Sequence, residues 1–529
     1  MRTSQDDIAR LPDLVHVHGR TGPYRERRPL YVDLLPPCNA GCPAGENIQA
    51  WLAHAKDGRH EQAWRQLVAD NPFPAIHGRV CYHPCESVCN RASLDSAVSI
   101  HSVERFLGDL ARERGWAFGR PAVRSGRRVL VIGAGPSGLS AAYHLARRGH
   151  DVEIRDAGER PGGMMRYGIP AYRLPRDVLD AELDRIAALG VRFTPGHRVT
   201  DLAAERADGR FDAVFVAVGA HLSKRVDIPA ADAGRIVDAL SFLRHVAEGE
   251  HPVIGRKVAV YGGGNTAMDA ARVARRLGAD ETLIVYRRTR AQMPAHEEEA
   301  ADAEREGVRI NWLRTITAFE GPELTVEAME LDSSGFPQPT GRFETLAADT
   351  VILAVGQDTD TAFLRQVPGV EFARDGTVGV GHGKKAARHI DAWLRAAQRD
   401  DAGPGTAGQG SQSAPAAKHD LASFGMLNLW YFGDAARRRQ PQAQPEQRVT
   451  GFGEVVSGLS EAEARYEAGR CLSCGNCFEC DGCLGACPED AVIKLGPGNR
   501  YRFDYDRCTG CATCYEQCPV HAIEMVPEG

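Results

Sequence analysis

Residues 127–157 read RRVLVIGAGPSGLSAAYHLARRGHDVEIRDA, and this stretch decides the fold of the middle of the chain. An apolar strand runs into a glycine turn, a helix follows, and a second strand ends at Asp156. Gly133, Gly135 and Gly138 form G-x-G-x-x-G, whose bare backbone lets a pyrophosphate approach the helix N-terminus. The carboxylate is placed to hold a ribose hydroxyl. A glycine turn alone is a weak signal, but strand, helix and acid together predict a dinucleotide site.

A second unit of the same kind follows at residues 256–288, RKVAVYGGGNTAMDAARVARRLGADETLIVYRR. Its second strand ends in Arg287 and Arg288 instead of an acid, and an arginine there can pair with a 2'-phosphate. We therefore predict NADPH in this unit; the alternative is a solvated strand end. Strands predicted at 211–220 and 349–357 complete the two units. The predicted fold class is α/β, with two interleaved doubly wound dinucleotide-binding domains.

Further residues near the two glycine turns are predicted to bind the cofactors. The run RPGGMMRYGIPAYRLP contains a second glycine pair that would admit a flat ring system. No nucleophile arrangement occurs in the sequence, so no side chain is predicted to act as an acid or base. The predicted set is Gly133, Gly135, Pro136, Ser137, Gly138, Asp156, Gly162, Gly163, Met164, Gly168, Ile169, Pro170, Gly219, Gly356 and Gln357 for the first unit, and Gly262, Gly263, Gly264, Asn265, Thr266, Arg287 and Arg288 for the second.

Length and composition exclude several classes of function. At roughly 150 residues per domain, 529 residues predict about three or four compact units. The 64 basic and 70 acidic residues give a net charge of -6, which offers no basic surface for nucleic acid or anionic membrane. No apolar run approaches the roughly 20 residues of a membrane span, and the N-terminal sequence lacks a signal-peptide core. We expect a cytoplasmic protein.

All 15 cysteines lie in two patches near opposite ends of the chain, Cys38 to Cys89 and Cys471 to Cys518. Disulfides that staple a core would be spread through the chain. An odd number of cysteines with repeated C-x2-C spacing, in a large chain expected in the cytoplasm, indicates metal ligation instead.

The C-terminal patch contains C-x2-C-x2-C-x3-C-P twice. Three thiolates at this spacing can wrap one [4Fe-4S] cluster, while the cysteine before the proline ligates the other cluster. The alternative, structural zinc, favours pairs of C-x2-C knuckles. The tail is too small to fold around a hydrocarbon core alone, and it resembles bacterial-type ferredoxins, α+β domains that carry single electrons. The predicted ligand sets are Cys477, Cys480, Cys483 with Cys518, and Cys508, Cys511, Cys514 with Cys487.

Motifs across residues 38–395 resemble the small subunit of NADPH-dependent glutamate synthase and the matching part of dihydropyrimidine dehydrogenase. They are GRVC (78–81), CESVC (85–89), VIGAGPSGL, PGGMMRYGIPAYRLP, GGGNTAMD, VYRR, MPA (293–295) and AVGQ. The resemblance implies FAD in the first unit and NADPH in the second, with hydride passing to the flavin and single electrons to iron-sulfur clusters. It also implies a hetero-oligomer. Relatives with a fused ferredoxin tail resemble subunits serving 2-oxoacid oxidoreductases, so ferredoxin or such an enzyme is the expected partner.

One departure from the family concerns the flavin. Family members carry a glycine-rich stretch ending in Gly-Asp shortly before the final helix, and its carboxylate contacts the ribityl side of FAD. Here EFARDGTV (371–378) runs directly into GVGHGKKAARHIDAWL. The absence of this stretch leaves three alternatives. Flavin binding is weakened, it is completed by a partner, or it is assisted by the later Gly433-Asp434 in WYFGD.

A second departure concerns the front cysteines. The family's front domain holds two clusters with seven cysteines and one other ligand, beginning with Arg-Cys-x-x-Cys-Gly. This chain has five front cysteines, and its Arg-Cys-x-x-Cys-Gly element occurs at 470–475. Our hypothesis is that this element folds back to the front domain; the alternative is a single front cluster. The hypothetical sets are Cys38, Cys89, Cys471 and Cys474 for one cluster, and Cys42, Cys81, Cys85 and, by analogy, Glu104 for another.

Three functions stay open at this stage. The favoured one is an NADPH-linked flavin and iron-sulfur electron-transfer subunit; the others are the glutamate synthase small subunit itself, and a non-catalytic iron-sulfur wiring protein that has lost FAD. The predicted organisation is an N-terminal arm (1–37), a helical iron-sulfur domain (38–120), an FAD domain (121–250 and 345–398), an NADPH domain (251–344), a flexible linker (399–420), a connecting segment (421–470) and a ferredoxin-like domain (471–529).

Overall fold

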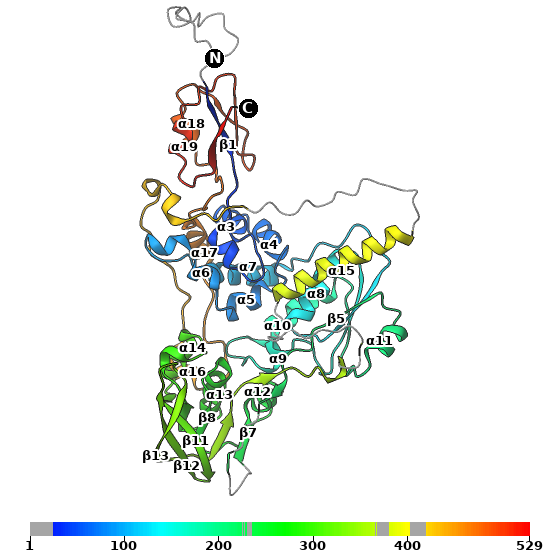
Figure 1. Ribbon diagram of the computed structural model, residues 1–529, viewed down its shortest axis with the longest axis vertical. Coiled ribbons are helices and arrows are strands. Elements are labelled where there is room, and N and C mark those ends of the chain that lie inside the picture. Colours follow the sequence, from blue (N-terminus) through cyan, green and yellow to red (C-terminus); the bar gives the residue numbers. More distant parts are fainter. Residues whose placement is uncertain are drawn as a thin grey trace, which may run out of the picture.

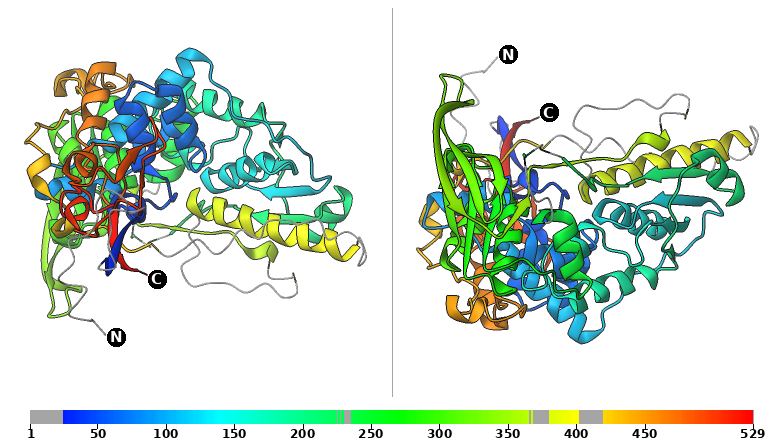
Figure 2. Two further views of the ribbon diagram at one scale, coloured as in Figure 1. Left: turned by 90° about the horizontal axis from the view of Figure 1, so that it is seen from above. Right: turned by 90° about the horizontal axis from the view of Figure 1, so that it is seen from below.

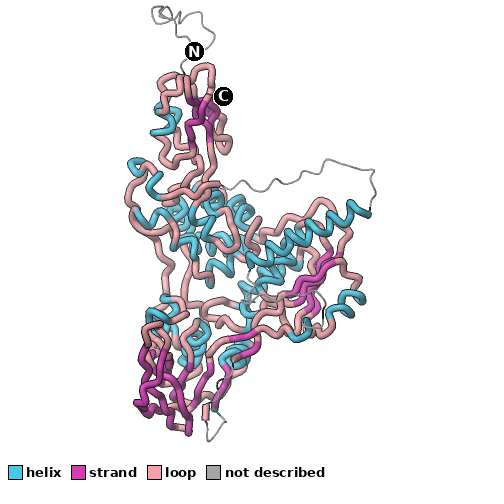
Figure 3. Tube along the Cα trace, in the orientation of Figure 1, coloured by secondary structure: helices cyan, strands magenta, loops and turns pink. Residues whose placement is uncertain are grey.

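The computed structural model describes residues 25–224, 226, 228, 229, 235–364, 367, 380–401 and 419–528. The stretch 371–378 and most of the predicted linker lie outside these residues. Figure 1 shows the ferredoxin-like domain at one end, a helical domain beneath it, and two α/β domains beyond. Figure 3 shows the same division, with helices gathered in the middle and strands toward the ends. No helix within the described ranges is long and apolar enough to span a membrane.

The region predicted as a helical domain, residues 38–120, consists of short helices around a buried core. Trp51 and Trp64 are fully buried, and Trp64 stacks on Phe118 with ring centroids 5.7 Å apart. This core is continuous with that of the first α/β domain, so the two regions pack as one body. The helices are α2 (Pro37–Gly41), α3 (Ile48–Lys56), α4 (His60–Val68), α5 (Pro74–Val80), α6 (Pro84–Ser87), η1 (Asn90–Ser93) and α7 (Ile100–Arg114).

The first α/β domain contains a parallel sheet in the order β4-β3-β2-β5. The glycine turn lies between β2 and α8, and Gly133 adopts φ +107°, a conformation that favours glycine. The long helix α15 packs along α8. The elements are β2 (Arg128–Ile132), α8 (Pro136–Arg147), β3 (Asp151–Arg155), α9 (Met164–Tyr167), α10 (Arg176–Ala187), β4 (Arg192–Thr194), α11 (Leu202–Asp208), β5 (Ala213–Val216), β6 (Leu222–Ser223), β15 (Gln357–Asp358), η4 (Ala362–Leu364) and α15 (Val380–Asp401).

The second α/β domain contains a parallel sheet in the order β10-β9-β8-β14-β7, beside an antiparallel sheet β11-β12-β13. Both doubly wound units are therefore present, and the predicted fold class is confirmed. The elements are β7 (Ile236–Asp238), α12 (Ala239–Ala247), β8 (Lys257–Tyr261), α13 (Asn265–Arg276), β9 (Glu281–Tyr286), η3 (Arg290–Gln292), α14 (Glu297–Arg305), β10 (Arg309–Trp312), β11 (Arg314–Glu320), β12 (Glu323–Leu331), β13 (Pro337–Ala347) and β14 (Thr350–Leu353).

The predicted boundaries between the two α/β domains need correction. Strand β14 pairs with β8 on one side and with β7 on the other, both in parallel. Residues 236–247 and 350–353 therefore belong to the second domain, although we assigned them to the first. The reason is that two short apolar strands on either side of a domain crossing carry no sign of which sheet they join.

The two ends of the chain meet in the ferredoxin-like domain. Strand β1 (Arg27–Tyr31) pairs antiparallel with the last strand, β18 (Ile523–Pro527), and Figure 2 shows the two side by side. The predicted N-terminal arm is thus partly a sheet strand, because the exposed edge of β18 takes it as a partner. The remaining elements are η5 (Phe424–Met426), η6 (Leu429–Tyr431), α16 (Pro445–Arg448), α17 (Glu461–Gly469), α18 (Gly482–Ala486), β16 (Val492–Lys494), β17 (Tyr501–Phe503) and α19 (Thr513–Glu516).

Candidate functional site

A pocket of about 1230 Å³ lies between the first glycine turn and the helical domain. This volume exceeds the range of about 300–1,000 Å³ that is usual for small-ligand pockets, as a dinucleotide requires. One wall holds Gly133, Gly135 and Asp156, and another holds Cys42, Cys81 and Cys85. The dinucleotide site and three front cysteines therefore share one space.

The chemistry of this pocket fits a bound dinucleotide. Ser137 lies in the first turn of α8, and its buried Oγ has no hydrogen-bond partner among the described residues. An acceptor or donor from a ligand pyrophosphate would satisfy it. Asp156 accepts hydrogen bonds from the backbone N–H of Ala134 (2.6 Å) and of Gly158 (2.7 Å), so its carboxylate also holds the glycine turn in place.

The structure separates the predicted flavin residues into two groups. The pocket wall contains Gly133, Gly135, Pro136, Ser137, Asp156, Gly163, Met164, Gly219 and Gln357. The wall does not contain Gly138, Gly162, Gly168, Ile169, Pro170 or Gly356. Gly138 lies against the Gly133 carbonyl, where a side chain would collide, and Ile169 packs on the hydrophobic core. Gly138 therefore supports the glycine turn, and Ile169 supports the core.

Sequence reasoning missed the part of the pocket that α15 supplies. Gly381, His382 and Lys385, at the start of that helix, line the pocket next to the point where the family's glycine-rich stretch is absent. The alternative that Gly433-Asp434 assists the flavin is wrong. The Gly433 carbonyl accepts a hydrogen bond from Arg91 (2.8 Å) in the helical domain, away from the pocket wall.

The second glycine turn also has a group suited to a phosphate. Arg288 follows β9, and its buried Nε has no hydrogen-bond partner among the described residues. The exposed Arg287 lies beside it. Gly263 lies so close to the Tyr286 ring that a side chain would collide, and Asn265 Oδ1 accepts from the His296 backbone N–H (2.8 Å). These contacts fix the turn, and Arg287 and Arg288 directly follow β9, at the position where an arginine can pair with a 2'-phosphate.

Three front cysteines and two carboxyl groups meet at the pocket's other wall. Burial raises the pKa of Cys42 and of Cys81 to about 12, with Glu46 and Glu104 adding to the effect. Asn71 Nδ2 donates to Glu46 (2.9 Å) and to Glu104 (2.8 Å). Thiolates buried beside carboxylates are costly without a cation, so this group of side chains fits a metal cluster. The sequence did not indicate Glu46, because it matches no ligand spacing.

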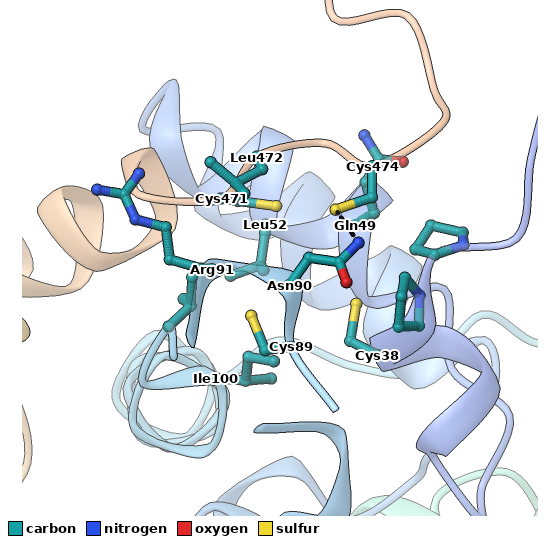
Figure 4. Close-up of a pocket in the computed structure, with 13 residues that line it drawn as sticks. Cys38, Gln49, Leu52, Cys89, Asn90, Arg91, Ile100, Cys471, Leu472 and Cys474 are labelled. Atoms are coloured by element: carbon teal, nitrogen blue, oxygen red, sulfur yellow. Dashed lines mark hydrogen bonds between the residues drawn. The ribbon is translucent and has the colours of Figure 1, made fainter. Parts of the chain in front are cut away.

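Four cysteines from both ends of the chain surround a second, smaller space (Figure 4). Cys38 and Cys89 point into it from the helical domain, and Cys471 and Cys474 from the C-terminal segment. Burial raises the pKa of Cys471 to about 12 and of Cys474 to about 11. The structure thus brings together the four cysteines of the first hypothetical set.

The ferredoxin-like domain arranges its eight cysteines in two groups. Burial, followed by neighbouring Cys483 and Cys518, raises the pKa of Cys477 to about 11. A separate cavity is lined by Cys487, Cys508, Cys511 and Cys514. This is the crossed arrangement of the predicted sets. Tyr31, from β1, lies with its hydroxyl 3.2 Å from Cys483 Sγ.

One further group of metal-binding residue types was not expected from the sequence. His83, Glu86 and His101 place their ligand atoms within 4.8 Å of one another beside the pocket. Glu86 is already engaged by the His101 ring (2.7 Å) and by Arg437 (2.5 Å), and the two histidine rings stack. The polar atoms of this group are paired with one another and with Arg437, and we assign no ion to it.

Comparisons with known families match the three regions described above. Residues 127–386 match the pyridine nucleotide-disulphide oxidoreductase family. Residues 33–116 match dihydropyrimidine dehydrogenase domain II, 4Fe-4S cluster. Residues 501–524 match the 4Fe-4S binding domain. The predicted cofactors, FAD, NADPH and [4Fe-4S] clusters at both ends of the chain, are confirmed at the level of these families.

Similar proteins are subunits of larger enzymes. The chain is 35% identical to the NADP(+)-dependent formate dehydrogenase subunit beta of Moorella thermoacetica, over 83% of this chain and 70% of that one. It is 35% identical to the glutamate synthase small chain of Azospirillum brasilense, over 66% and 79%. It is 37% identical to the NADPH-Fe(3+) oxidoreductase subunit beta of Geobacter sulfurreducens, over 65% of this chain and 54% of that relative. The chain therefore belongs to the family of NADP(H)-dependent flavin and iron-sulfur oxidoreductase subunits that includes the glutamate synthase small chain.

Proposed function

We propose that this subunit carries electrons between NADPH and a partner oxidoreductase, entering or leaving through its ferredoxin-like domain. The observation that carries the proposal is the shared pocket, in which the dinucleotide turn and three buried cysteines face the same space. When bound, FAD exchanges hydride with nicotinamide and single electrons with iron-sulfur clusters. A flavin held here would therefore lie next to the first cluster.

The chain's own residues have binding and positioning roles in this proposal. Gly133, Gly135 and Ser137 hold the flavin pyrophosphate at the start of α8, and Arg287 and Arg288 hold the 2'-phosphate of NADPH. The helical domain closes the other side of the pocket and keeps water from it. Cys42, Cys81, Cys85 and Glu104, which line the same pocket, would hold the cluster nearest the flavin, and this cluster and those of the tail would supply single-electron transfer.

We further propose that the partner is ferredoxin or a larger oxidoreductase of the 2-oxoacid class, in the cytoplasm. The fused two-cluster tail supports this role over that of the glutamate synthase small subunit, because the glutamate synthase subunit does not need such a tail. The names of the relatives, a formate dehydrogenase and an iron(III) reductase among them, support a hetero-oligomer and leave the partner's substrate open.

The test is flavin extraction together with NADPH-dependent reduction of a viologen dye by the intact, anaerobically purified protein. We expect about one FAD per chain and dye reduction that is faster with NADPH than with NADH. A protein that holds clusters without flavin, and that does not reduce the dye in the intact assembly, is a wiring protein and contradicts the proposal. Co-purification from the source identifies the partner.

A further inference from the structure

The position of Cys471 and Cys474 is set by a polar clamp that does not involve their thiols. Arg470, 2% exposed, donates to Asp95 (3.0 Å), to Glu467 (2.9 Å) and to the Ser96 carbonyl (2.7 Å). Arg91 donates to the Arg470 carbonyl (3.1 Å). These bonds hold the C-terminal segment on the loop that follows Cys89, so the four sulfurs face one space.

Two further contacts fix the turn that carries the thiols. Ser473 Oγ accepts a hydrogen bond from Gln49 Nε2 (2.7 Å), and the Gly475 carbonyl accepts one from the Leu34 N–H (3.0 Å). Apart from Arg91, the rest of the cavity is lined by apolar and uncharged side chains, Pro37, Leu52 and Ile100 among them. A dry four-thiol cavity that both ends of the chain approach is a metal site by the chemistry of its donors.

The front cysteines are divided between two sites. Cys38 and Cys42 are four residues apart at the two ends of α2, and Cys85 and Cys89 are four apart around α6. In each pair one cysteine lines the flavin pocket and the other lines the four-cysteine cavity. Four residues of chain span at most about 14 Å even when fully extended, so the two sites are close neighbours.

The other side of the cavity leads into the ferredoxin-like domain. Cys474 is separated from Cys477, a member of the first ferredoxin group, by only two residues. The four-cysteine cavity therefore lies between the flavin-side cysteines and the tail. Zinc has no redox chemistry and would interrupt this series, whereas an iron-sulfur cluster continues it.

We infer that Cys38, Cys89, Cys471 and Cys474 hold a [4Fe-4S] cluster that relays single electrons between the flavin-side cluster and the ferredoxin-like domain. The relay role, as distinct from the presence of the cluster, rests on the proposed function. The cluster takes one electron from one neighbour and gives one to the other, and no bond is made or broken. Neither end of the chain can build this site alone.

Metal content tests the site itself. We expect about 16 irons per chain in anaerobically reconstituted protein, four for each of four clusters. Cys471→Ser with Cys474→Ser, and separately Cys38→Ser with Cys89→Ser, should each leave about 12. Glu461→Ser, at a position on α17 whose side chain is 62% exposed and holds no thiol, should keep the full count. About 12 irons in the unaltered protein, an unchanged count in either double variant, or loss of one zinc in place of iron overturns the inference.

Electron transfer tests the relay. Protein reduced with titanium(III), freed of reductant and mixed with NADP+ should lose its cluster EPR signals, because two electrons and one proton convert NADP+ to NADPH. In the Cys471→Ser, Cys474→Ser variant the flavin should still be reoxidised while the tail signals persist. Tail signals that disappear as fast as in the unaltered protein overturn the relay. A flavin that NADP+ never oxidises in the unaltered protein instead contradicts the proposed function, and the iron counts stand independently.

Discussion

At the scale of single residues, Tyr31 links the N-terminal strand to the tail's chemistry. Its hydroxyl is 3.2 Å from Cys483 Sγ, and its ring stacks on Phe503 with centroids 4.7 Å apart. If Cys483 is an iron-bound thiolate, the tyrosine must be the donor, because the sulfur has no proton. A donor stabilises the more negative, reduced cluster and so raises its reduction potential.

Tyr31→Phe is therefore expected to shift the potential of one tail cluster to a more negative value and leave the other unchanged. An EPR-monitored redox titration measures both. Tyr505→Phe is the matched control, because the Tyr505 hydroxyl donates to the Pro29 carbonyl (2.9 Å) and to no sulfur in the described residues. Equal shifts in the two variants would show that packing, and not the hydrogen bond, sets the potential.

We predict that the preference for NADPH depends on Arg288. Its buried Nε lacks a partner among the described residues, and a charge-assisted bond to a 2'-phosphate contributes about 1.5–3 kcal/mol. Arg288→Ala should therefore raise the KM for NADPH by about 10- to 100-fold and barely change the KM for NADH. Steady-state dye reduction with each nucleotide measures this. Arg290→Ala, which removes an exposed partner of Glu304, should change neither KM.

At the scale of elements, α15 anchors the loop that follows Cys42. Lys384 Nζ donates to the Ala44 carbonyl (2.8 Å) and the Gly45 carbonyl (3.0 Å), and pairs with Asp70 (2.6 Å). The side chain is nearly buried, so Lys384→Met leaves all three acceptors without this partner. We expect the free energy of unfolding to fall by about 3 kcal/mol. Calorimetry should show a lower midpoint of thermal unfolding. Arg388→Met, exposed on the same helix, should leave the midpoint unchanged.

Helix α8 buries a histidine whose protonation opposes folding. Burial, followed by the charge of Arg148, lowers the pKa of His144 to about 3. The unfolded chain binds this proton near pH 6.5, so stability from the neutral histidine is present above that pH and is lost as pH falls toward 3. At pH 7, His144→Gln should lower the free energy of unfolding. Below about pH 6 this difference from the unaltered protein should shrink by about 1.4 kcal/mol per pH unit.

Urea unfolding of the variant and of the unaltered protein at several pH values measures this difference in the free energy of unfolding. Any loss of clusters in acid affects both proteins alike, so it cancels in the difference. His389→Gln, exposed on α15, is the control and should show no such trend. A difference between His144→Gln and the unaltered protein that stays constant with pH would contradict a neutral buried histidine.

At the scale of the whole molecule, the N-terminal strand completes a domain that the other end of the chain begins. Arg25 pairs with Glu528 through two nitrogens and donates to the Cys508 carbonyl (3.0 Å), and Pro29 lines the second tail cavity. A chain that begins at Val32 should therefore lose the tail clusters, about eight irons of about 16. Iron analysis and limited proteolysis check this. Leu30→Ser, which keeps the backbone pairing, should retain the iron; full iron in the truncated chain contradicts the dependence.

Much of the fold was predictable because its signals are local. Each G-x-G-x-x-G-like turn lies between a strand and a helix within about 30 residues, as the doubly wound fold requires. The tail's repeated cysteines are equally local. The short strands β7 and β14 were assigned to the wrong domain, and β1 was expected to be part of an arm, because each joins a sheet far away in sequence.

The candidate site was predicted in part for the same reason. Ser137 and Asp156 follow from the turn, whereas Lys385 and Glu46 reach their sites through packing between distant elements. Gly138 and Ile169 were expected at the ligand and instead support the turn and the core, because a motif specifies which residues build a turn and not which of their atoms face the pocket.

The sequence by itself determined the chemistry of this protein: two dinucleotide turns, two ferredoxin repeats, and seven further cysteines at opposite ends of the chain. Only the tertiary structure decided that those ends meet, with Cys471 and Cys474 facing Cys38 and Cys89. The physical reason is that thiol spacing is written along the chain, while the clamp of Arg470 on Asp95 and the pairing of β1 with β18 are long-range contacts that form only in the folded state.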